Sequence, residues 1–437
     1  MLSLNLVFSN RGQTQEQSKL RSVVLSSMIG NMLEWYDFAL YGYFSTLLAQ
    51  VFFPLKDPVA ALLATYGAFA AGFLMRPLGG IIFGYIGDHI GRKKALLWSI
   101  YLMSFPTFAI GCLPTYAQIG WLAPLLLTVI RLLQGLSMGG EFTGSIVFIV
   151  EHAEGKRRGF YGSFAPFSAV LGLLMGSGIA ALLSFALPAE HLTSWGWRIP
   201  FALSILGGWL GSYMRRTLGD PAAFEENKKT KHAKKAFFFK ELFSQHRKSL
   251  ITVFLVDLLV AIGFYLIVTF LVGYLEQFIG LPRHTALLIN TLSTVVFALT
   301  IPLTGCFLDT WGRKPLMIGA ALGFAFLSVP LFHGLLSGYV PLILGASMGL
   351  SCLMGVYFAA IPAILVESFP ARLRYSGISI AHNLSMALFG GSAPFLVTWM
   401  IRTSDSLLAP AIYLTFASCG ALLGLCLLKD RTHEKLS

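Results

Sequence analysis

Long apolar runs separated by short polar breaks make up almost the whole chain. Each run holds about 20 residues or more, the length at which an α-helix crosses the hydrocarbon core of a bilayer. The runs are continuous, whereas a transmembrane β-strand would alternate apolar and polar positions. The pattern predicts twelve membrane-spanning helices, at residues 22–51, 59–87, 94–113, 121–150, 159–187, 196–214, 249–279, 285–308, 315–336, 340–366, 375–401 and 408–428.

The composition excludes a compact water-soluble fold. The 437 residues are 56% hydrophobic and 12% charged, whereas an ordinary soluble domain has about 25% charged residues. Too little polar surface exists to cover this chain in water, which excludes soluble enzymes and nucleic-acid-binding proteins. Lipid offers the backbone no hydrogen-bond partner, so the expected fold class is an all-α integral membrane protein.

One long polar stretch, residues 215–248, interrupts the predicted helices near the middle of the chain. It predicts two six-helix halves joined by a linker, whose last residues ("AFFFKELFSQHRK") form either an amphipathic helix on the membrane surface or a solvated basic connector. The expected divisions are a cytoplasmic N-terminal segment 1–21, an N-terminal half 22–214, a cytoplasmic linker 215–248, a C-terminal half 249–428 and a cytoplasmic tail 429–437.

The placement of Lys and Arg predicts the orientation. If the N-terminus is inside, 26 of the 32 basic residues fall in cytoplasmic segments, and outside segments hold Lys56, Arg283 and Arg402. Cytoplasmic loops of membrane proteins carry such an excess of basic residues. Both termini are therefore expected in the cytoplasm.

The cysteines indicate neither a disulfide framework nor a metal site. They form no CxxC pair, have no His at metal-ligand spacing, and lie in apolar runs, where packing as small apolar side chains is expected. They are Cys112, Cys306, Cys352, Cys419 and Cys426. We expect no metal and no cofactor.

Two loop motifs repeat between the halves. "GYIGDHIGRKK" at residues 84–94 matches "GCFLDTWGRKP" at residues 305–315. A second motif, a Glu followed seven residues later by an Arg, occurs as Glu151 with Arg158 and as Glu367 with Arg374. Basic loops alone would serve to set the topology, but the matched Asp and Gly spacing favours a duplicated transporter architecture.

These loops and the six-plus-six layout resemble the major facilitator superfamily. The segments "GNMLEWYDFALYGYF", "FLMRPLGGIIFGYIGDHIGRKK", "RLLQGLSMGGEFTGS", "WGWRIPF" and "FGGSAP" are similar to its metabolite:H⁺ symporter branch, which includes bacterial carriers of proline and betaine, 2-oxoglutarate, citrate and shikimate. The resemblance implies the major facilitator fold and a bacterial inner-membrane location. It also implies an inner-side conformational latch formed by Asp88, Arg92, Glu151 and Arg158, with a weaker second copy formed by Asp309, Arg313, Glu367 and Arg374. Pro315 stands where the first copy has Lys94, which weakens the equivalence.

Ionisable residues inside apolar helices are costly and point to function. Asp37 and Glu141 are the main candidates for proton coupling, and Glu34 and Asp257 are further ones. Glu34 lies nearer the inner interface, where a structural role is favoured. The alternative for Asp257 is a pairing with a residue of the first helix. Asn31, Glu34, Asp37 and Tyr41 lie within one arc of about 120° on the first helix. This polar stripe must face a water-filled cavity or other helices.

Arg76 and Arg131 are expected to pair with these carboxylates or to anchor substrate; pairing that is only structural is the alternative for each. Tyr41, Tyr265, Tyr357 and Asn383 lie mid-helix and are expected to line the substrate cavity. A structural role is favoured for His382.

The expected function is proton-coupled import of a small organic solute by alternating access, by a protein that works as a monomer in the bilayer. Carboxylates outnumber arginines within the spans, and the aromatic residues could hold a quaternary ammonium group by cation–π contact, which favours a zwitterion such as proline or betaine. The alternatives are a mono-, di- or tricarboxylate substrate and a passive facilitator. A membrane enzyme is not expected, because neither DxxxD nor HExxH occurs.

Overall fold

A computed structural model describes residues 2–56, 58–153, 157–216, 238–434 and 436. Within these residues every regular element is a helix. The N-terminal half contains α1 (Leu2–Tyr43), α2 (Ser45–Phe52), α3 (Pro58–His89), α4 (Arg92–Cys112), α5 (Tyr116–Ile119), α6 (Leu122–Met138), α7 (Glu141–His152), α8 (Arg158–Gly162), α9 (Phe164–Ala186), α10 (Ala189–His191), the π-helix η1 (Leu192–Gly196) and α11 (Arg198–Arg216).

The C-terminal half follows the short helix α13 (Phe238–Gln245). It contains α14 (Arg247–Tyr265), the π-helix η3 (Leu266–Phe270), α15 (Leu271–Gln277), α16 (Arg283–Leu308), α17 (Arg313–Leu335), α18 (Val340–Glu367), α19 (Arg374–Ser385), the π-helix η4 (Met386–Gly390), α20 (Ala393–Ser404) and α21 (Ala409–Leu427).

Ten stretches of the described chain are long and apolar enough to cross a membrane, from Gly67–His89 to Ala409–Leu427. The two other predicted spans correspond to α1, which carries Asn31, Glu34 and Asp37, and to α11, which has Arg at both ends. Both helices pack along the N-terminal half, α1 on α9 and α11 on α4. The prediction of an all-α membrane protein is confirmed, with ten of the twelve predicted spans long and apolar enough to cross a membrane in the described residues.

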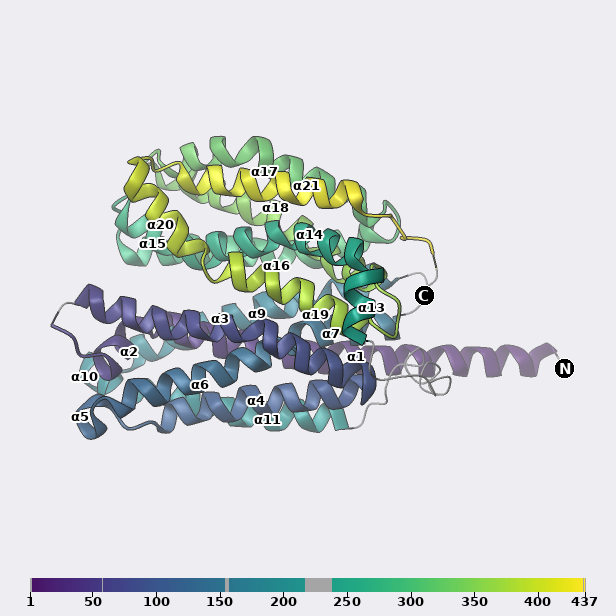
Figure 1. The fold of residues 1–437 in the computed structure, drawn as a ribbon, viewed down its shortest axis with the longest axis horizontal. Helices are drawn as coiled ribbons and strands as arrows, with labels where there is room; N and C mark the ends of the chain where they lie inside the picture. The colour runs from purple at the N-terminus through teal and green to yellow at the C-terminus, as the bar shows by residue number, and fades with distance from the viewer. Residues whose placement is uncertain (1, 57, 154–156, 217–237, 435, 437) are drawn as a thin grey trace.

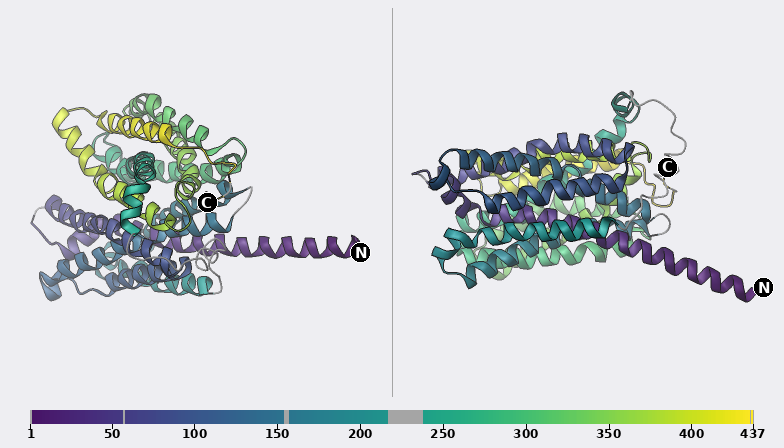
Figure 2. Two further views of the ribbon diagram at one scale, coloured as in Figure 1. Left: turned by 45° about the vertical axis from the view of Figure 1, so that its right-hand side comes forward. Right: turned by 90° about the horizontal axis from the view of Figure 1, so that it is seen from below.

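The first predicted span differs from the structure at both ends. α1 begins at Leu2 rather than near residue 22 and projects beyond the bundle (Figures 1 and 2). The helix also ends at Tyr43, and α2 continues the chain from Ser45. Hydropathy shows which residues lie in lipid, but a helix continues wherever its backbone hydrogen bonds continue. The helix α1 therefore begins before the apolar span does.

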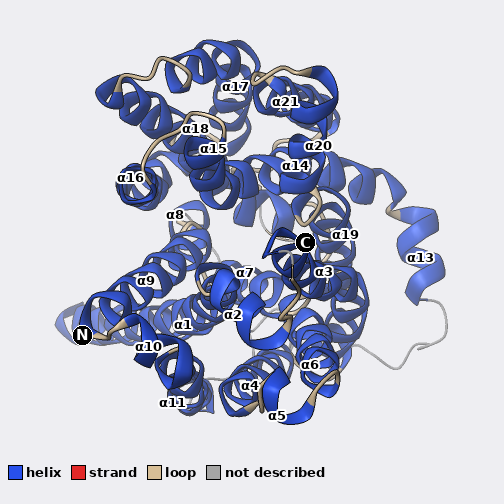
Figure 3. Cartoon of the chain, turned by 90° about the vertical axis from the view of Figure 1, so that its left-hand side faces the viewer, coloured by secondary structure: helices blue, strands red, loops and turns tan. Residues whose placement is uncertain are grey.

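The two halves lie side by side, and the helices of both run roughly along the long axis of the molecule (Figure 1). Their contacts are made by α3 with α19, α9 with α16, and α7 with α18. The loops 89–92 and 309–313 and both chain ends lie at one end of the bundle, which we call the motif end. The α13 helix lies beside the bundle (Figure 3); a helix was one of the two expectations for this part of the linker, of which residues 217–237 lie outside the described residues.

Glycines allow the helices of the N-terminal half to touch backbone to backbone. A Cβ on Gly79 of α3 would lie 2.1 Å from the Leu136 carbonyl oxygen of α6, and one on Gly135 would lie 1.9 Å from the Gly72 carbonyl oxygen. In lipid no hydrophobic force drives helices together, so close van der Waals packing at small residues stabilises such crossings instead.

The cysteines were expected to pack as small apolar side chains, but they are not packed against other helices. All five are free thiols on the exposed surface of the bundle. Their neighbours are apolar because that surface is built to contact lipid, so an apolar run did not distinguish core from lipid-facing positions.

Candidate transport site and charge networks

The repeated loops form equivalent turns at the motif end. Gly91 has a φ of 144° and Gly312 a φ of 90°, and each directly precedes a helix, α4 or α17. A side chain at these positions would be strained, which explains the repeated glycine. Each turn brings the Asp of its motif within reach of the Arg four residues later: Asp88 pairs with Arg92, and Asp309 pairs with Arg313 at 2.9 Å.

The first charge network is buried beneath the loop between α3 and α4. Arg92 contacts Asp88 and, at 3.3 Å, Glu151. Arg374 of the other half lies 2.8 Å from the same Glu151 oxygen. The backbone nitrogen of Ser376 donates to Asp88 at 2.9 Å, so α19 is tied to the N-terminal half through both carboxylates.

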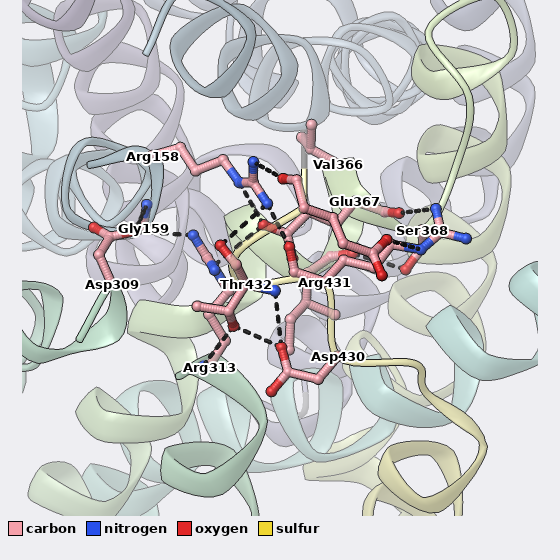
Figure 4. A network of polar contacts seen from close by, with 12 residues as sticks. Arg158, Gly159, Asp309, Arg313, Val366, Glu367, Ser368, Asp430, Arg431 and Thr432 are labelled. Carbon is pink, nitrogen blue, oxygen red and sulfur yellow. Dashed lines mark hydrogen bonds and ion pairs between the residues drawn. The ribbon is translucent and has the colours of Figure 1, made fainter. Parts of the chain in front are cut away.

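The second network repeats this arrangement with the halves exchanged (Figure 4). Glu367 lies 3.3 Å from Arg313 of its own half and 2.6 Å from Arg158 of the other. Asp309 accepts hydrogen bonds of 2.9 Å from the backbone nitrogens of Gly159 and Phe160. Arg158 also donates to the carbonyl of Arg431 at 2.6 Å, which holds the C-terminal tail against the network.

The structure regroups the eight predicted latch residues. The family resemblance implied that Arg158 belongs with Glu151 and Arg374 with Glu367. Instead Arg374 pairs with Glu151 and Arg158 with Glu367, so the two arginines are exchanged between the halves. Each network thus joins three residues of one half to one Arg of the other, and both cross the boundary between the halves.

Asp37 belongs to a chain of hydrogen bonds inside the N-terminal half. Thr107 of α4 donates to Asp37 at 2.9 Å, and Gln134 of α6 donates to Thr107 at 2.7 Å. Arg131 in turn donates to Gln134 at 2.8 Å, and its guanidinium carbon lies 4.4 Å from the ring centre of Tyr41. The predicted association of Asp37 with Arg131 therefore runs through two polar side chains.

The other predicted carboxylates lie at separate places. Glu141, at the start of α7, accepts a hydrogen bond from Ser99 of α4. Glu34 of α1 interacts electrostatically with Tyr265 of the other half, so it lies near the boundary between the halves. The polar stripe of α1 faces other helices, and Asp37 and Glu141 are only 2% and 1% exposed.

Arg76 lies at the boundary between the halves. Its Nε donates to Asn383 of α19 at 3.2 Å, and Asn383 donates to the Gly139 carbonyl at 2.7 Å. The Nη1 of Arg76 has no hydrogen-bond partner among the described residues, although the side chain is buried. Arg76 therefore offers an unused donor in the interior.

Aromatic rings surround this region from both halves. Phe73 beside Arg76 lies 5.4 Å from Tyr265, and Trp35 lies 5.0 Å from Phe264, measured between ring centres. The Tyr265 hydroxyl lies close to Arg76 and interacts with it across the boundary between the halves. Tyr41 and Tyr357 instead donate to backbone carbonyls, at 3.0 Å and 2.8 Å, so their hydroxyls are already used.

His382 lies against Asp257, a contact that sequence reasoning did not predict. Its Nδ1 lies 3.1 Å from Asp257, and the two residues face each other across α14 and α19. The only available signal was the position of His382 next to Asn383 in a predicted span. No group of three potential metal ligands occurs in the part of the chain that the structure describes.

Two helical halves, each with its copy of the loop motif and held together by buried ion pairs, define a membrane carrier. Sequence models agree: residues 23–220 match the family described as "Sugar (and other) transporter", and residues 253–437 match the Major Facilitator Superfamily. Among solved structures, that of the proton:xylose symporter XylE with a bound bromo-deoxyglucose has a TM-score of 0.80 at 18% identity, covering 96% of this chain and 98% of the other. The inward-open form from E. coli has a TM-score of 0.65 at 19% identity, covering 95% and 98%.

Curated relatives cover nearly the whole chain. The proline/betaine transporter of Salmonella typhimurium is 32% identical over 96% of this chain and 86% of its own length. The glycine betaine/proline/ectoine/pipecolic acid transporter OusA of Dickeya dadantii is 33% identical over 96% and 85%, and a putative proline/betaine transporter of Staphylococcus aureus is 35% identical over 92% and 87%. The chain belongs to the major facilitator superfamily. It is a transporter and not an enzyme, as the motifs predicted.

Proposed function

We propose that this protein imports a small zwitterion such as proline or a betaine together with protons, by alternating access of its two halves. The observation that carries the substrate class is the unused Nη1 donor of Arg76 next to aromatic rings from both halves. A carboxylate is the natural ligand of an arginine, and the faces of aromatic rings attract a quaternary ammonium. The named substrates of the curated relatives support the same class.

Within this site, Arg76 would take the carboxylate of the substrate and Asn383 would orient Arg76. Trp35, Phe73 and Tyr265 would hold the cationic end, with the carboxylate of Glu34 nearby. Tyr41 and Tyr357 act as supports, since their hydroxyls already have partners. Arg131 is a second anchor for a carboxylate in this proposal, because its Nε also lacks a partner among the described residues.

Asp37 is the first candidate for the coupling proton. One of its oxygens accepts from Thr107, and the other has no partner within the described residues. Through Thr107 and Gln134 it is linked to Arg131, so a proton on Asp37 and a substrate on Arg131 would influence each other. Glu141 is a second candidate, and its bond to Ser99 ties it to α4 as well. Both carboxylates are buried, so this proposal requires that another conformation opens them to water.

The two charge networks would act as the latch that closes the motif end while the opposite end opens. We further infer that the motif end faces the cytoplasm of a bacterial inner membrane, because basic residues concentrate there. The divisions at residues 21, 214, 248 and 428 then separate cytoplasmic segments from the two halves. The monomer contains both halves and is the expected working unit.

The test is uptake into proteoliposomes with an imposed proton gradient, using labelled proline, glycine betaine, citrate and 2-oxoglutarate. We expect accumulation of a zwitterion that stops when a protonophore is added. Asp37→Asn should abolish accumulation, because the variant cannot bind the proton; Glu141→Gln tests the second candidate in the same way. Accumulation of carboxylates alone would favour the second substrate class, and uptake that ignores the gradient would indicate a passive facilitator.

A further inference from the structure

Asp257 and His382 form a buried acid–base pair in the C-terminal half, away from the proposed proton site on Asp37. The His382 Nδ1 lies 3.1 Å from one Asp257 oxygen, and both side chains are at most 1% exposed. The other Asp257 oxygen has no hydrogen-bond partner in the described part of the chain. Such a carboxylate is tolerated in a membrane interior when a proton or a cation cancels its charge.

Among the groups on the helices packed around the pair, His382 is the one that can supply the compensating proton. From α18, Tyr357 interacts electrostatically with Asp257, but its hydroxyl donates to the carbonyl of Val256. The packed elements α21 (Ala409–Leu427), η3 and η4 contain no charged residue.

The N-terminal half also brings no charge directly to the pair. From α7 the ring of Phe142 lies 5.4 Å from that of His382, whereas the preceding Glu141 accepts from Ser99 of α4. From α3, Arg76 bonds to Asn383. Of these groups, His382 is the histidine, the residue type that commonly carries protons in proteins.

The pair is connected to the boundary between the halves through one residue. Asn383 follows His382 in α19 and bonds both to Arg76 and to the Gly139 carbonyl of the N-terminal half. The helices that carry the pair continue directly into π-helices, α14 into η3 and α19 into η4. Such segments interrupt the regular helical hydrogen bonding and occur often at functional sites. A change in the distance between Asp257 and His382 would therefore move the contact made by Asn383.

We propose that Asp257 and His382 form a second proton-binding site, and that its proton sets the contact between α19 and the N-terminal half. With one proton shared between them the pair is neutral. When that proton leaves to water, a single negative charge remains on Asp257, which is unfavourable in a dry interior. The deprotonated pair must then reach water, which separates α14 from α19. This inference rests on the proposed proton-coupled function.

The test compares two activities of each variant in proteoliposomes: gradient-driven accumulation of labelled proline or betaine, and counterflow of the same solute without a gradient. For Asp257→Asn and His382→Gln we expect the ratio of accumulation to counterflow to fall about tenfold or more. We also expect the dependence of counterflow on pH to flatten. Asp405→Asn, in an exposed loop, and His152→Gln, at the end of α7, are matched controls that should keep the wild-type ratio.

Each possible result of this experiment has a specific interpretation. If both activities fall by the same factor and the pH profile keeps its shape, the pair is only structural and the inference is wrong. If Asp257→Asn does not insert, Asp257→Glu should retain coupling with a shifted pH profile, and an unshifted profile would contradict the proposal. A wild-type protein that shows no gradient-driven accumulation would overturn the proposed function itself, and this inference with it.

Discussion

At the scale of single residues, Arg76 is the main structural reason for proposing a zwitterionic substrate. A buried guanidinium normally spends its donors on fixed acceptors, since an unpaired one costs free energy. Arg76 uses its Nε on Asn383 and leaves Nη1 without a partner in the described chain. Arg198 shows the contrasting case, because its Nη1 donates to the carbonyls of Gly111 and Leu113 at 2.7 Å. Arg198 fastens two helices, whereas Arg76 has capacity for a ligand.

We expect Arg76→Ala to weaken the apparent affinity for the zwitterion by about tenfold to a hundredfold, because a charge-assisted hydrogen bond contributes roughly 1.5–3 kcal/mol. Arg76→Lys should recover part of this, since it keeps the charge but loses the planar geometry. Uptake measured over a range of substrate concentrations gives the affinity. Arg198→Lys is the control and should lower thermal stability without changing affinity. An unchanged affinity in Arg76→Ala would remove Arg76 from the site.

At the scale of elements, α3 packs two glycine faces against different partners. Gly72 and Gly79 face α6 within the N-terminal half, whereas Gly84 and Gly87 face α19 of the other half. The first face holds one half together, and the second allows the halves to approach at the motif end. The same residue type therefore serves packing within one half on one face and contact between the halves on the other.

Adding a methyl group on each face should separate these roles. In Gly84→Ala the new Cβ would lie 2.7 Å from the Cα of Ser376, so we expect the halves to separate at the motif end. In Gly79→Ala it would lie 2.1 Å from the carbonyl oxygen of Leu136, which should destabilise the fold by about 1–3 kcal/mol.

The measurement for both variants is alkylation of a reporter, Ser163→Cys, buried at the motif end, in a chain whose native cysteines are replaced by Ser. Gly84→Ala should raise the labelling rate with a normal melting temperature. Gly79→Ala should lower the melting temperature. If both variants changed only the melting temperature, α3 would have no separate role in closing the halves.

At the scale of the whole molecule, the two charge networks fasten the halves at the motif end. Arg374 with Glu151 and Arg158 with Glu367 are the ion pairs that cross the boundary. Their members are almost completely buried, so removing one partner leaves a charge without compensation. The duplicated motifs thus produce one joint with approximate two-fold symmetry, and neither half can build it alone.

Breaking the first crossing pair should favour opening of the motif end. Glu151→Gln and Arg374→Gln should each destabilise the closed state by about 3–5 kcal/mol, and the double variant by less than the sum, because the singles leave a buried charge unpaired. Labelling of Ser163→Cys measures the opening. Asp88→Asn should act in the same direction, since it weakens the bond to Ser376 of α19. Additive effects of the two single changes would show that the residues do not act as a pair.

The limits of sequence reasoning follow from the range of each interaction. Hydropathy located the spans because every lipid-facing residue contributes to it, and the motif spacing located the turns because Gly91 and Gly312 act locally. Pairing between distant residues left no such signal. The family resemblance kept Arg158 in one set with Glu151 and could not show that Arg158 meets Glu367 instead. His382 was not connected with Asp257, although the two are in contact.

The order of apolar and polar residues by itself determined that this chain is helical, crosses the membrane repeatedly and has two related halves, because transfer into lipid depends on each segment's own composition. Only the tertiary structure decided which charges meet. It exchanged Arg158 and Arg374 between the halves, buried Asp37 behind Thr107, and left the Nη1 of Arg76 without a hydrogen-bond partner among the described residues. These outcomes depend on how two bundles pack against each other, and that geometry involves residues far apart in the chain.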